Sequence, residues 1–169
     1  MKSWLVLACA ASFCGAAGAD DLILSMDGMG RVEIGSSRDS MERVLHRRYE
    51  LDKPCEVVNS SETAQLGVSY MIEANRLVRI DVDYYANSPE PLTIHTPEGI
   101  GLGSPEADVI KAYGNRVRVE PNPGDPTWHY LYVDTPDHSR GFAFDTDGKK
   151  VKSMHAGEYP ALGYKDGCP

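Results

Sequence analysis

Hydrophobic residues recur at helical spacing in two stretches of the chain, and each stretch follows a glycine–serine pair. In residues 36–49 the apolar positions form one helical stripe made of Met41, Val44, Leu45 and Tyr49. In residues 104–114 the stripe is Val109, Ile110 and Tyr113, and a helix-ending glycine follows at Gly114. A serine oxygen can accept a hydrogen bond from a free amide at a helix start, so we predict two helices capped by Ser36 and Ser104.

After each predicted helix, hydrophobic and polar residues begin to alternate, as in half-buried strands. Residues 68–84 alternate on both sides of Ala74-Asn75, and residues 142–154 alternate on both sides of Asp147-Gly148. Asp-Gly is a favoured two-residue hairpin turn. We therefore predict two antiparallel hairpins, with further strands at 55–59, 117–119 and 128–133.

The two halves of the chain resemble each other. Aligning residues 32–49 with residues 100–113 places Gly35 on Gly103, and the two hairpins also align after a short insertion. We therefore predict an α+β fold with two tandem helix-plus-antiparallel-hairpin repeats that form one compact body. Chance similarity between two such segments is the alternative.

The proline-rich stretch between the halves cannot continue a strand ladder, because proline has no amide hydrogen to donate. We predict a connector there and place the repeats on either side of it, with the ranges 20–86, 87–95 and 96–169.

The first residues have the pattern of an export signal. Lys2 precedes an apolar run, and Ala17-Gly18-Ala19 is a small-residue cleavage pattern. We predict a signal peptide at 1–19 and an exported protein, periplasmic or secreted. The apolar run is shorter than the roughly 20 residues that span a bilayer. Lipid attachment at Cys9 is the alternative.

Cleavage after Ala19 would leave two cysteines, Cys55 and Cys168. In an oxidising compartment we expect them to form a disulfide that fastens the C-terminal end to an early site in the mature chain. Two free thiols are the alternative.

Composition and charge narrow the classes of partner. The chain has 169 residues, of which 41% are hydrophobic and 25% charged, and its formal net charge is −8. This is ordinary globular composition for one domain or two very small ones. An acidic chain repels phosphate groups overall, so its net charge argues against nucleic acid and anionic lipid as partners.

Motifs for catalysis, metals or cofactors are weak. We find no Gly-x-Ser-x-Gly, and the Gly99–Gly103 stretch lacks the lysine of a phosphate-binding loop. Asp145-Thr146-Asp147-Gly148 begins like a calcium loop, but lysines follow where oxygen ligands should continue. We therefore expect no catalytic residue, metal or cofactor. The alternative is a small-ligand binder or an uncommon hydrolase using Asp81, Asp83, His129 or His155.

Tyrosine and tryptophan are suited to partly solvated contact surfaces, because each combines an apolar ring with a hydrogen-bonding group. Alternation on a strand would place Trp128, Tyr130 and Tyr132 on one face and His129, Leu131 and Val133 on the other. One of these faces must be core. The candidate residues for binding a partner are Tyr84, Tyr85, Trp128, Tyr130 and Tyr132.

The Gly-Ser helix starts at 34–36 and 102–104, with the hairpins that follow, resemble the β-lactamase-inhibitor-protein-like group and the SmpA/OmlA-type outer-membrane assembly lipoproteins. The stretch TPEGIGLG at 96–103 and the terminal Gly167-Cys168 are also similar to uncharacterised bacterial periplasmic proteins. The resemblance implies a non-enzymatic, inhibitor-like or immunity-like module that binds another protein. A structural or assembly component of the cell envelope is the alternative.

Overall fold

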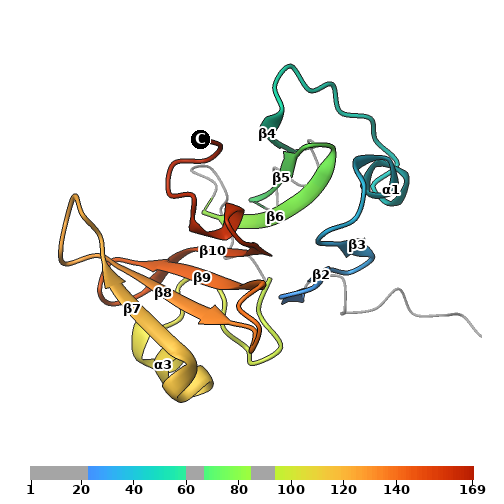
Figure 1. The fold of residues 1–169 in the computed structure, drawn as a ribbon. Coiled ribbons are helices and arrows are strands. Elements are labelled where there is room, and N and C mark those ends of the chain that lie inside the picture. Colours follow the sequence, from blue (N-terminus) through green and yellow to red (C-terminus); the bar gives the residue numbers. More distant parts are fainter. Residues whose placement is uncertain (1–22, 60–66, 85–93) are drawn as a thin grey trace, which may run out of the picture.

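Antiparallel strands from both halves of the chain form one seven-stranded sheet in the computed structural model (Figure 1), which describes residues 23–59, 67–84 and 94–169. The strand order is β4-β5-β6-β10-β9-β8-β7, so β6 and β10 join the two halves. The strands are Cys55–Val58 (β4), Val68–Glu73 (β5), Arg76–Asp83 (β6), Val117–Pro121 (β7), His129–Asp134 (β8), Arg140–Thr146 (β9) and Val151–Glu158 (β10).

Shorter elements surround this sheet. A small three-stranded sheet comprises Leu24–Ser25 (β1), Gly28–Met29 (β2) and Val32–Glu33 (β3). The helices are Arg38–Val44 (α1) and Glu106–Tyr113 (α3), with single 3-10 turns at Gly114–Arg116 (η2) and Ala161–Gly163 (η3). Within the described ranges, no helix is long and apolar enough to cross a membrane.

The predicted fold class is wrong. Within the described residues the protein is mainly antiparallel sheet with two short helices, and it is not built from two helix-plus-hairpin repeats. The β6–β10 pairing merges the hairpins into one sheet, and β1–β3 have no counterpart among the described residues of the second half. Local periodicity predicts hairpins, but it does not predict which strands pair across the chain.

Both predicted hairpins are confirmed as local structures. β5 and β6 are joined at Ala74 and Asn75, which both have positive φ, of 49° and 60°. β9 and β10 are joined through the turn that contains Asp147 and Gly148. Asp147 Oδ1 accepts the amides of Lys149 and Lys150, so this carboxylate closes the turn in the way a hairpin requires.

The predicted caps are wrong at both helices. Ser37, rather than Ser36, caps α1 by accepting the Ser40 amide. Pro105 precedes α3 without a side-chain cap, while Ser104 Oγ accepts the Gly101 amide from the preceding loop. Both helices begin one position later than predicted, so Ser36 and Ser104 precede the cap position, and their backbone carbonyls accept the amides of Leu77 and Val151 from the following hairpins.

The main core lies between the inner face of the large sheet and α3, α1 and the small sheet. Tyr113 of α3 packs against Phe142 and Phe144 of β9, with ring centroids about 6 Å apart. Leu131 and Val133 of β8 join the same cluster. The opposite, outer face of the sheet carries the polar and aromatic residues described below.

Candidate functional site

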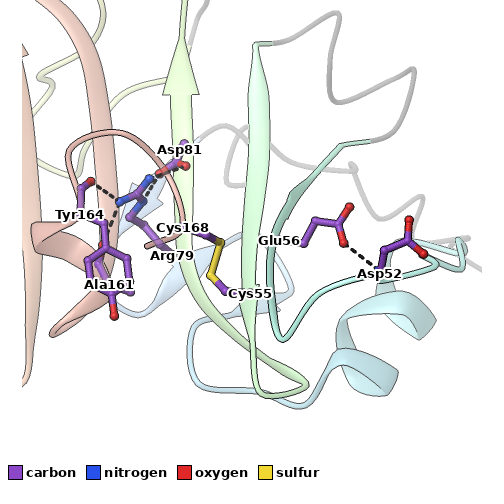
Figure 2. The surroundings of a disulfide bond; sticks show 8 residues. All are labelled: Asp52, Cys55, Glu56, Arg79, Asp81, Ala161, Tyr164 and Cys168. Carbon is purple, nitrogen blue, oxygen red and sulfur yellow. Dashed lines mark hydrogen bonds and ion pairs between the residues drawn. A yellow bond between two sulfur atoms is a disulfide. The ribbon is translucent and has the colours of Figure 1, made fainter.

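The C-terminal segment runs back across the outer face of the large sheet after β10 (Figure 1). The predicted disulfide is confirmed, because Cys168 is bonded to Cys55 at the start of β4. Figure 2 shows this bond beside Arg79, whose guanidinium reaches the carbonyl oxygens of Ala161 and Tyr164, both at 2.8 Å. One buried side chain and one covalent bond therefore hold the segment on the sheet.

Arg79 belongs to a charged cluster in the middle of this outer face. Its guanidinium makes a two-point contact with Asp81, at 2.6 and 3.1 Å, and both side chains are buried. On the neighbouring strand, His155 Nδ1 lies 2.8 Å from Asp81 Oδ1, and His155 Nε2 lies 3.8 Å from Asp145 Oδ2. The register of β10 produces these contacts, because it places His155 directly opposite Asp81.

The cluster holds its charges in the ionised form. Burial would lower the pKa of His155, but Asp81 and Asp145 outweigh that effect and raise it to about 10. Burial would raise the pKa of Asp81, but His155 and Arg79 outweigh it, so this pKa lies below its usual range. At neutral pH, His155 is therefore a cation between two carboxylates.

Ser153, His155 and Asp81 form a chain that resembles a nucleophile, a base and its orienting acid. Ser153 Oγ lies 3.3 Å from His155 Nε2. A general base must be able to take the proton of the nucleophile. The protonated imidazole of His155 cannot do so at neutral pH, since its neighbouring carboxylates hold the proton in place. The contact is therefore a hydrogen bond within an ion network.

The predicted grouping of Asp81, Asp83, His129 and His155 is only partly formed. Asp81, Asp83 and His155 share the outer face, whereas His129 lies on the inner side, where its Nδ1 is 3.0 Å from Glu106 at the start of α3. His129 is thus on the other side of the sheet from His155. Within the described ranges, no group of three or more histidine, cysteine, aspartate or glutamate residues is arranged to hold a metal ion.

The aromatic residues of β8 point away from the main core. Trp128, just before β8, is 38% exposed, Tyr130 is half-buried, and Tyr132 is only 4% exposed. Tyr132 packs with Ala143 and Leu162, because the C-terminal segment covers that end of the strand. The sequence left open whether this face was core; the structure places Tyr130 and Tyr132 away from the main core and leaves Trp128, just before the strand, exposed.

A lysine from the C-terminal segment lies against these rings. Lys165 Nζ is 3.5 Å from the ring centroid of Tyr130 and 4.6 Å from that of Tyr132, and it also bonds the Tyr132 hydroxyl. Glu120 of β7 lies 4.0 Å from the same nitrogen. Burial lowers the pKa of Lys165, while Glu120 and Asp145 oppose that shift.

Of the two other candidate tyrosines, Tyr84 lies within the described residues. Tyr84 is 49% exposed, and its hydroxyl lies against Gly103 in the loop before α3, 2.9 Å from where a Cβ on that glycine would be. Tyr85 lies outside the described residues. The predicted signal peptide at 1–19 also lies outside them, as does the predicted connector up to residue 93.

Sequence reasoning missed Arg79, Ser153 and Lys165, and it considered Asp145 only as the start of a calcium loop. A signal for Arg79 was present, because it alternates with Asp81 and Asp83 between the apolar residues of one strand. Lys165 carried no such signal, since its contacts join positions that are far apart in the chain.

No family model, curated protein or solved structure matches this chain. The resemblance to the β-lactamase-inhibitor-protein-like group therefore stays a prediction.

Proposed function

We propose that this protein is an exported, non-enzymatic module that binds another protein in an inhibitor-like or immunity-like manner. Its contact surface comprises Trp128 and the outer-face residue Tyr130. The observation that carries the proposal is the exposure of Trp128: a large aromatic side chain stays 38% exposed immediately before β8. Aromatic anchors of this kind dominate the binding energy of many protein interfaces.

Two further features support a binding role. Tyr130 is held in place by Asn122, whose amide donates to its hydroxyl at 2.8 Å, so little side-chain entropy remains to be lost on binding. The charged groups nearby are paired with one another, and His155 is protonated at neutral pH, which supports recognition over acid–base chemistry. The disulfide supports export to an oxidising compartment.

The test is capture of partners from an envelope extract with immobilised mature protein, followed by identification and titration of the captured protein. Trp128→Ala is expected to weaken binding by at least tenfold, since truncating an interface hot spot typically costs about 2 kcal/mol or more. Tyr84→Ala is the comparison variant, because Tyr84 is also an exposed aromatic residue but its hydroxyl lies against Gly103 in the loop before α3. Absence of a saturable partner, or equal binding by both variants, would refute the proposal.

A further inference from the structure

The contacts of Lys165 resemble those of a cation held in an aromatic site. Its ammonium group faces the rings of Tyr130 and Tyr132 and lies near the carboxylate of Glu120. Ring faces carry partial negative charge and attract ammonium groups, most strongly where water is partly excluded. The Lys165 side chain is 34% exposed, so the site is shielded on one side and open on the other.

The walls of the site are independent of the lysine that fills it. Tyr130 and Tyr132 alternate on β8, and Glu120 and Asp145 lie opposite Tyr130 on the two neighbouring strands. Asn122 holds Tyr130, and Arg118 packs over Tyr132 with its guanidinium carbon 4.4 Å from the ring centroid. Strand register therefore brings together the cage of Glu120, Tyr130, Tyr132 and Asp145, whereas the C-terminal segment supplies the occupant and Leu162, which packs against Tyr132.

The occupant is attached in a way that permits exchange. Lys165 lies between two points that hold the segment, the Tyr164 carbonyl bonded to Arg79 and the disulfide at Cys168. Its side chain can rotate out while the backbone stays in place. The segment therefore presents a lysine at high local concentration without covering the cage completely.

We propose that the cage of Glu120, Tyr130, Tyr132 and Asp145 is a binding site for the side-chain ammonium of a lysine on a basic partner protein, and that Lys165 occupies it as a competing internal ligand. The inference rests on the proposed protein-binding function and specifies its partner as basic. The formal net charge of −8 over the whole chain favours such a partner, while at the cage itself Glu120 also pairs with Arg118 and Asp145 lies 3.8 Å from His155.

The cage can be tested without the natural partner. The probe is Nα-acetyl-lysine methylamide, and binding is followed by the ring proton chemical shifts of Tyr130 and Tyr132. An internal ligand lowers apparent affinity in proportion to the time it occupies the site. If Lys165 fills the cage about nine-tenths of the time, Lys165→Ala binds the probe about tenfold more tightly than the wild type. Acetyl-norleucine methylamide, which lacks the ammonium, is expected not to bind.

Matched variants separate the cage from general effects. Lys152→Ala removes a lysine that is paired with Asp147 in the β9–β10 turn, and it is expected to leave probe affinity unchanged. In the Lys165→Ala background, Tyr130→Leu is expected to abolish probe binding, whereas Tyr130→Phe, which keeps the ring, retains most of it. Thermal unfolding of each variant checks that the fold is kept.

Several results would overturn the inference. These are equal probe affinity in the wild type and Lys165→Ala, equal binding of the norleucine analogue, or a Tyr130→Leu variant that still binds. The outcome is distinct from that of the partner capture, because the probe titration requires no partner. A cage that binds lysine in a protein with no saturable partner would refute only the proposed function. A captured partner insensitive to Lys165→Ala would refute only the cage.

Discussion

Replacing Arg79 with methionine tests what holds the C-terminal segment on the sheet. Arg79 is 4% exposed, and its guanidinium bonds both oxygens of Asp81 and the carbonyl oxygens of Ala161 and Tyr164. Methionine keeps much of the length of the side chain but donates no hydrogen bond. The variant therefore leaves the buried carboxylate of Asp81 with His155 as its remaining charged partner and leaves two carbonyl groups unpaired.

The expected loss of stability is large. Removing one partner of a buried ion pair typically costs about 3–5 kcal/mol, because the remaining charge stays buried. For a domain of this size each kcal/mol lowers Tm by roughly 2–4 °C, so a decrease of roughly 6–20 °C follows. The free energy of unfolding decreases by more than this if the two carbonyl groups remain buried without a hydrogen-bond donor. It decreases by less if the segment moves enough for water to reach them.

Chemical denaturation and thermal unfolding of the mature protein, followed by circular dichroism, measure this loss. Arg76→Met is the matched control, since Arg76 pairs with Glu158 at 3.2 Å but its side chain is 54% exposed. An exposed pair contributes about 1 kcal/mol or less. If Arg79→Met and Arg76→Met lose the same small amount, the buried network does not stabilise the segment and our account of it is wrong.

Two further predictions concern the disulfide and His155. Reducing the Cys55–Cys168 bond, or replacing both cysteines with serine, is expected to cost about 4–5 kcal/mol in the chain-entropy model; thermal unfolding with and without reductant measures it, and an unchanged Tm would contradict it. The pKa of His155 in the folded protein, about 10, lies above its ordinary value of 6.5, so its stabilising contribution is complete below pH 6.5 and is lost as the pH rises toward 10. The stability difference between the wild type and His155→Gln should therefore shrink between pH 6 and pH 10 in urea unfolding, and a constant difference would contradict the assigned protonation state.

Much of the local structure could be predicted because it depends on neighbouring residues. The alternation around Ala74-Asn75 and Asp147-Gly148 predicted both hairpins. Of the predicted α3 stripe, Val109 and Tyr113 are buried, but Ile110 is 43% exposed, so that part of the prediction was wrong. The disulfide followed from counting the cysteines that remain after export. The predicted helix caps were wrong, because each helix begins one residue later than its sequence pattern suggested and Ser104 Oγ instead accepts the Gly101 amide in the preceding loop.

The candidate site could be predicted only in part. The alternation of Trp128, Tyr130 and Tyr132 identified the residues of one face, but an alternating strand is equally consistent with either face being core. His129 was grouped with residues that the folded sheet places elsewhere. The contact of His155 with Asp81 requires the register between β6 and β10, and a slip of one residue would turn His155 to the opposite face.

The sequence by itself determined the hairpins, the burial of Val109 and Tyr113 in α3 and the identity of the disulfide partners, because each depends on short-range spacing or on residue counts. Tertiary structure alone decided that the two halves share one sheet, that the β8 aromatic residues lie opposite the main core, and that Lys165 reaches Tyr130. These features join segments far apart in the chain. Their formation depends on strand register and on which face finds a partner to cover it, and neither is encoded in the periodicity of a single segment.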